Sequence, residues 1–72
     1  MHTRRFLPEA IREKVTNLPE YRMGAHKVAV VLRDGRVVED VIVAWGKEII
    51  SEGGQIEISF LPEDVMDVVD RS

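Results

Sequence analysis

Residues 27–45, KVAVVLRDGRVVEDVIVAW, decide the fold of this chain of 72 residues. Two segments rich in β-branched apolar residues lie on either side of Asp34-Gly35. Asp-Gly between such segments is a strong local sign of a β-hairpin, because both residues tolerate the positive φ of a two-residue type I′ turn. The stretch therefore predicts a long antiparallel hairpin with strands at 26–33 and 36–45.

The apolar pattern of the hairpin predicts how it is covered. In the first strand, residues 28, 30 and 32 are apolar on one face and residues 29 and 31 on the other. A strand with two apolar faces is covered on both sides. In the second strand, Glu39-Asp40 interrupts the pattern, and such a polar pair predicts a bulge where the strand bends.

Three further strands are predicted at 47–51, 55–60 and 65–69. Turns at Gly46 and at Gly53-Gly54 separate the first two, and Pro62 opens a single 3₁₀ turn over 61–64 before the last. Residues 55–60 have the most regular alternation in the chain, which predicts that Ile56, Ile58 and Phe60 point inward.

Residues 8–18 predict a short helix. Pro8 suits a first helical position, and Pro19 ends the helix. Ile11, Val15 and Leu18 form one apolar stripe, and a helix this short is stable only when packed on something else. We therefore predict one domain over 1–72, with an arm at 1–7, the helix at 8–18 and a β-barrel at 26–70.

This order resembles two families of small β-barrels. Five strands with a one-turn helix before the last is the plan of SH3-like barrels, and an N-terminal helix before five bent strands is that of Sm-like proteins. Residues 28–35, VAVVLRDG, resemble the first Sm-like motif, and Phe6-Leu7 before a charged helix resembles the start of Hfq-type chains. The resemblance implies a five-stranded antiparallel barrel. Leu61-Pro62-Glu63-Asp64 stands where Hfq-type chains carry a Tyr-Lys-His run, so their RNA-binding residues have no match here.

Composition narrows the class of protein. The chain has no Cys, which removes disulfides and thiolate metal sites and fits a reducing cytoplasm. No apolar run reaches the roughly 20 residues that cross a bilayer, so we expect no membrane association. A chain this small buries only roughly 60% of its unfolded surface, and oligomerisation is a natural source of further burial.

Charge is unevenly distributed along the chain. Residues 1–36 hold eight Lys or Arg and four acidic residues, a charge of +4, whereas residues 37–72 hold two and nine, a charge of −7. Folding either interleaves the two halves, so that their fields cancel, or leaves a bipolar surface that favours self-association or an oriented partner.

No set of residues predicts catalysis. His26 has no recognisable partner nucleophile or orienting carboxylate, and we expect it to be a surface residue at a strand edge. No pair of His residues has metal-ligand spacing. The sequence therefore predicts neither an enzyme, nor a cofactor or metal, nor a small-molecule substrate.

Binding is the remaining class of function. Trp45 is either the main side chain of the core or an interface anchor. If the chain has a binding surface, we expect it to contain Trp45, Tyr21, Arg22 and Lys47.

Two charged clusters have alternative interpretations. Four basic residues near the N-terminus form either a solvated face or a nucleic-acid contact: Arg4, Arg5, Arg12 and Lys14. Four acidic residues near the C-terminus either keep a barrel edge from pairing with other chains or recognise a basic partner: Glu63, Asp64, Asp67 and Asp70. We predict a non-catalytic protein-interaction or self-assembling module in the cytoplasm, with a protein partner or a homo-oligomer. An Sm-like RNA-binding protein is the alternative.

Overall fold

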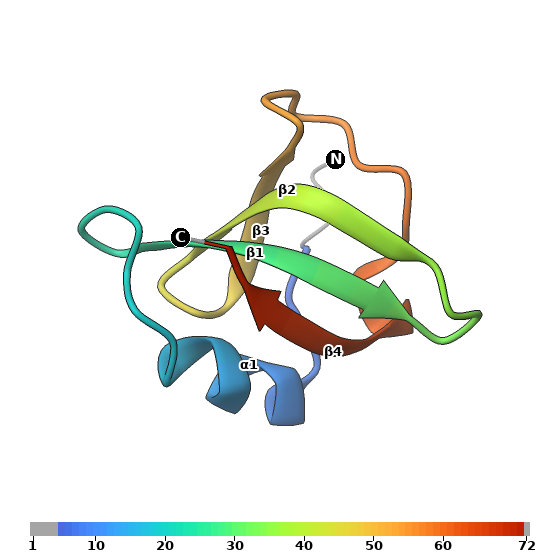
Figure 1. The fold of residues 1–72 in the computed structure, drawn as a ribbon, viewed down its shortest axis with the longest axis horizontal. Helices are drawn as coiled ribbons and strands as arrows, with labels where there is room; N and C mark the ends of the chain where they lie inside the picture. The colour runs from blue at the N-terminus through green and yellow to red at the C-terminus, as the bar shows by residue number, and fades with distance from the viewer. Residues whose placement is uncertain (1–4, 72) are drawn as a thin grey trace.

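The computed structural model describes residues 5–71, which contain one helix and a four-stranded antiparallel sheet (Figure 1). The elements in chain order are α1 (Glu9–Thr16), β1 (Ala25–Leu32), β2 (Val37–Ala44), β3 (Glu48–Glu52), the 3₁₀ turn η1 (Pro62–Asp64) and β4 (Val65–Asp70). The strand order is β3-β2-β1-β4, and α1 packs against one face of the sheet. The prediction of a mainly β chain with one short N-terminal helix is confirmed.

The central hairpin is confirmed, but its turn differs from the prediction. β1 and β2 pair antiparallel from Ala25↔Ala44 to Val31↔Val37. The Leu32 N–H donates to the Arg36 carbonyl at 2.8 Å and the Gly35 N–H donates to the Leu32 carbonyl at 2.9 Å, which encloses a loop of three residues. Only Gly35 takes a positive φ there, of 92°, as in a type I turn followed by a left-handed residue. The Asp34 carboxylate accepts the Arg36 N–H at 3.0 Å, which fixes this longer turn.

The predicted bulge at Glu39-Asp40 is present. The register of β1 and β2 shifts between Val28↔Val41 and Val30↔Val38, so β2 holds one extra residue there. Asp40 has φ 59°, a left-handed conformation that Asp tolerates better than most residues. The extra residue bends β2 and increases its twist.

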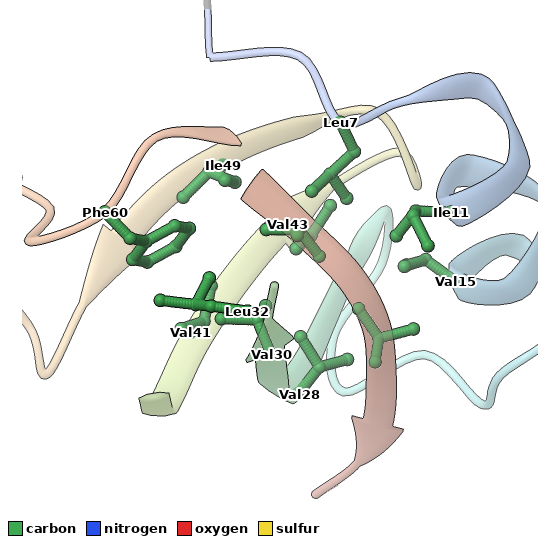
Figure 2. Packing of buried hydrophobic residues seen from close by; sticks show 12 residues of the cluster. Leu7, Ile11, Val15, Val28, Val30, Leu32, Val41, Val43, Ile49 and Phe60 are labelled. Atoms are coloured by element: carbon green, nitrogen blue, oxygen red, sulfur yellow. The ribbon is translucent and has the colours of Figure 1, made fainter. Parts of the chain in front are cut away.

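The core lies between α1 and the inner face of the sheet (Figure 2). Val28, Val30 and Leu32 of β1 point into it, as the sequence pattern predicts. Ile11 and Val15 of α1 are buried against them, and Leu18 packs at the margin. The predicted apolar stripe of the helix is therefore confirmed. The other buried side chains of this core are Leu7, Val41, Val43, Ile49, Phe60, Val65 and Val68.

The predicted fourth strand is wrong. Among residues 55–60, Gln55 makes only an isolated bridge with Glu52. Ile56 is 73% exposed, whereas Phe60 is buried in the core. Gly53 and Gly54 both take positive φ, and the Glu52 carboxylate accepts the Ser59 N–H at 2.8 Å, so the chain folds back locally instead of extending beside β3. Four strands form in place of five, and the sheet is not closed into a barrel.

The described part of the predicted arm, residues 5–7, is not an arm. The Leu7 side chain is fully buried, and its N–H donates to the Lys47 carbonyl at 2.9 Å. The Ile49 N–H donates to the Arg5 carbonyl at 3.0 Å, and Phe6 forms a bridge with Glu48. Residues 5–7 therefore cover the outer edge of β3. Two apolar residues before a proline carry too little pattern to predict this.

Candidate functional site

Two loops meet at the end of the molecule opposite the turn at residues 33–36 (Figure 1). One is the connector between α1 and β1, and the other is the β2–β3 turn. The Trp45 N–H donates to the Gly24 carbonyl at 2.5 Å. A Cβ on Gly24 would lie 2.7 Å from carbons of the Trp45 ring, so the ring packs directly on the Gly24 backbone. Gly24 is required here twice, since it also has a φ of 77°.

Trp45 is not the main side chain of the core. Its side chain is 68% exposed, and it takes a φ of 56°, which is uncommon for a bulky residue. The next residue, Gly46, packs so closely on α1 that a Cβ there would lie 2.6 Å from Thr16 Oγ1. The turn therefore contacts the helix through Gly46, and the indole ring remains at the surface.

A first hollow, of about 420 Å³, lies between Trp45 and α1. It brings together two of the four residues expected in a binding surface, Trp45 and Lys47. The helix contributes Glu9, Arg12, Glu13, Thr16 and Asn17. This hollow therefore combines an exposed aromatic ring with side chains of both charges.

The other two expected residues, Tyr21 and Arg22, line a second hollow of about 320 Å³. It lies over the sheet face opposite the core, because Lys27 and Ile42 alternate with core residues of β1 and β2. Its remaining lining residues are Ala25, Asp40, Ser51 and Gly54. The predicted set is thus divided between two hollows at one end of the molecule.

Sequence analysis did not single out Met23 as a binding residue. The Ala25 N–H donates to the Arg22 carbonyl at 2.9 Å, so Met23 lies at the tip of a tight turn. Its side chain is 92% exposed. We call the exposed side chains of Tyr21, Met23 and Trp45 the Trp45 patch. A Met before Gly in a short connector is the one sequence signal that could have indicated it.

The basic residues of the nucleic-acid alternative do not form a common surface in the described part of the chain. The Arg5 guanidinium donates to the Ile56 carbonyl. Arg12 Nε donates to the Leu7 carbonyl at 2.7 Å, and Lys14 Nζ lies 2.8 Å from Asp67 Oδ1. Residues two apart on a helix do not face each other, so Arg12 and Lys14 lie on different sides of α1. Arg4 lies outside the described residues.

One member of the acidic C-terminal cluster guards an edge of the sheet. The Arg71 N–H donates to Lys27 on β1, and N–H directions alternate along a strand, so the Val68 N–H points away from β1. That N–H donates to Asp67 Oδ1 at 2.8 Å. The Lys14 ammonium and the Val68 N–H together lower the pKa of Asp67. This geometry matches the edge-blunting interpretation of the cluster.

His26 is buried, contrary to the expectation of a surface residue. It is 4% exposed, and its Nδ1 has no hydrogen-bond partner among the described residues. His26 has the same facing as Val28 on β1, so the alternation that buries Val28 also buries His26. Within residues 5–71, no group of His, Asp or Glu side chains is arranged to hold a metal ion.

Comparison of the chain with protein-family models, with curated proteins and with solved structures finds no match. In the described part of the chain, no helix is long and apolar enough to span a membrane.

Proposed function

We propose that this chain is a non-catalytic protein-interaction module, and that its partner binds the Trp45 patch. The conformation and exposure of Trp45 carry this proposal. A bulky residue in the left-handed region costs free energy, and such strain is concentrated at functional sites. An indole that is 68% exposed leaves apolar surface that a partner can bury.

The surroundings of Trp45 favour a binding role. Its ring is held against Gly24, so its side chain is already ordered before a partner arrives, and pre-ordering lowers the entropic cost of binding. Trp and Tyr are common anchors of protein interfaces, and Met adapts to irregular surfaces. The hollows on either side of the patch can receive side chains of the partner.

The Sm-like RNA-binding alternative has less support. Arg5, Arg12 and Lys14 are bonded to the chain's own carbonyl or carboxylate groups, and the net charge is −3. A kinship with SH3-like or Sm-like barrels remains part of the proposal on narrower grounds. β4 follows a 3₁₀ turn and pairs with β1, as the last strand does in that plan. The absence of Cys is the ground for proposing a cytoplasmic location.

The first experiment distinguishes a second copy from a different partner. We would measure molar mass by light scattering on a sizing column over a hundredfold range of concentration. If a second copy is the partner, the mass exceeds 8.2 kDa and returns to it in the Met23→Ala variant. Met23 is suited to this test because its side chain is 92% exposed, so its truncation leaves the core intact.

If the chain is a monomer, we would select binders from a random peptide library and remove those that also bind Trp45→Ala. The proposal expects peptides whose affinity falls by roughly tenfold or more in Trp45→Ala, the usual loss at an interface anchor. Met23→Ala supplies a second variant, and circular dichroism checks the fold of both. Binding that is equal in the wild type and both variants would contradict the proposal, as would a monomer that selects no peptide.

A further inference from the structure

The second hollow gathers hydrogen-bond donors from three parts of the chain. Arg22 comes from the connector, Lys27 from β1 and Ser51 from β3. Lys27 and Ser51 are both register partners of Ile42, so they lie on either side of it across three adjacent strands. The hollow of about 320 Å³ thus has an apolar floor at Ile42 and donors around it.

The positive charge of this hollow is incompletely neutralised. The Arg22 guanidinium and the Lys27 ammonium lie 5.3 and 5.6 Å from the centre of the Tyr21 ring, so two cations converge on one side chain. The one carboxylate in the lining, Asp40, is 3.7 Å from Lys27 Nζ. That exceeds the roughly 2.7–2.9 Å of a charge-assisted hydrogen bond.

Two of the donors have no partner of this kind. Among residues 5–71, Arg22 forms no ion pair, and the Ser51 hydroxyl makes no hydrogen bond. A guanidinium, an ammonium and a hydroxyl are therefore available together around one space.

We infer that this hollow binds a phosphate group carried by the partner protein. The inference rests on the proposed function and names part of what the partner presents. A phosphorylated side chain has three strong acceptor oxygens, which match the three donors, and its charge answers the excess of cations. The hollow adjoins the Trp45 patch, because Ala25 and Arg22 at its rim close the turn that carries Met23.

A protein is favoured over nucleic acid as the source of the phosphate. Nucleic-acid backbones are bound by a series of cations along a track. Here Arg5, Arg12 and Lys14 are bonded elsewhere. The Tyr21 ring is contacted by two cations, which competes with base stacking on it.

The test is an NMR titration of ¹⁵N-labelled protein at constant ionic strength. The probes are inorganic phosphate, N-acetyl-phosphoserine amide, N-acetyl-serine amide and a single-stranded oligonucleotide. We expect phosphate and phosphoserine to shift the amides of residues 22, 27 and 51 selectively, and N-acetyl-serine amide to shift none. Arg22→Gln and Lys27→Gln should each weaken phosphoserine binding roughly tenfold, the usual effect of losing one charge-assisted hydrogen bond. Arg36→Gln is the matched control, since Arg36 lies in the turn at the opposite end and pairs with Asp34 at 3.0 Å.

Three results would overturn the inference. They are shifts spread evenly over the surface, phosphoserine binding unchanged in both Arg22→Gln and Lys27→Gln, and oligonucleotide binding tighter than that of phosphoserine. If library peptides still depend on Trp45 while phosphate has no effect, this inference fails and the proposed function stands. If phosphoserine binds but no protein contact depends on Trp45, the hollow stands and the proposed function fails.

Discussion

The two edges of the sheet are closed by different means. Beyond β3, residues 5–7 supply backbone hydrogen bonds and bury Leu7 completely. Beside β4, the outward N–H of Val68 is bonded to the Asp67 carboxylate, which Lys14 holds from α1. The first edge depends on apolar burial, which is insensitive to salt. The second depends on exposed charges, which salt screens and acid neutralises. The comparison teaches that one edge is part of the fold and the other is protected only conditionally.

The largest effect is expected at the β3 edge. Leu7→Ala removes a fully buried side chain and leaves a cavity, which should lower the free energy of unfolding by about 2–5 kcal/mol. Urea denaturation measures the loss. Glu9→Ala, at an exposed position of α1, is the control. A loss below about 1 kcal/mol would mean that residues 5–7 are not anchored by Leu7.

The second effect is expected at the β4 edge and concerns association. Asp67→Val removes the acceptor of the Val68 N–H and the inward charge, so the edge becomes able to pair with a second copy. Light scattering should show a mass that rises with concentration above that of the wild type. Glu57→Val removes the same charge from an exposed residue outside any strand, and should not change the mass. Equal masses for Asp67→Val and Glu57→Val would show that Asp67 does not protect this edge.

A smaller effect is expected from the lysine that holds Asp67. Lys14→Met keeps most of the aliphatic stem and removes one ion pair between half-exposed side chains, so it should cost no more than about 1 kcal/mol. The same urea measurement at low and high salt sharpens the comparison between edges. The difference between Lys14→Met and the wild type should shrink at high salt, whereas the loss in Leu7→Ala should not. A difference that grows with salt would contradict this account of the β4 edge.

The smallest effect is the dependence of stability on pH. The pKa of Asp67 is lowered in the folded chain, by Lys14 first and then by the Val68 N–H. The stability that this gives is therefore present above the ordinary pKa of Asp, about 3.9, and is lost as pH falls through the folded pKa below it. Unfolding measured between pH 5 and lower pH should decline less steeply in Asp67→Asn than in the wild type. Parallel curves for the two proteins would exclude this contribution.

Local pattern was enough to predict part of this structure. The hairpin, the bulge at Glu39-Asp40 and the buried stripe of α1 depend on residues close together in sequence, and each was predicted. The separation of Trp45 and Lys47 from Tyr21 and Arg22 was not predicted, although all four lie at one end. Their grouping depends on how the connector and the β2–β3 turn pack, through Gly24 and Gly46, on parts of the chain distant in sequence.

The sequence by itself determined the secondary structure of β1, β2, β4 and α1, because period and turn chemistry act over a few residues. Only the tertiary structure decided which apolar residues are covered. Leu7 is buried because the edge of β3 is open to it, and Trp45 is exposed because Gly46 occupies the contact with α1. Ile56 alternates as a strand residue does, yet it has no neighbouring strand, since Gly53-Gly54 and Glu52 fold the chain back first. Burial depends on which surfaces meet, and that is set by contacts between residues far apart along the chain.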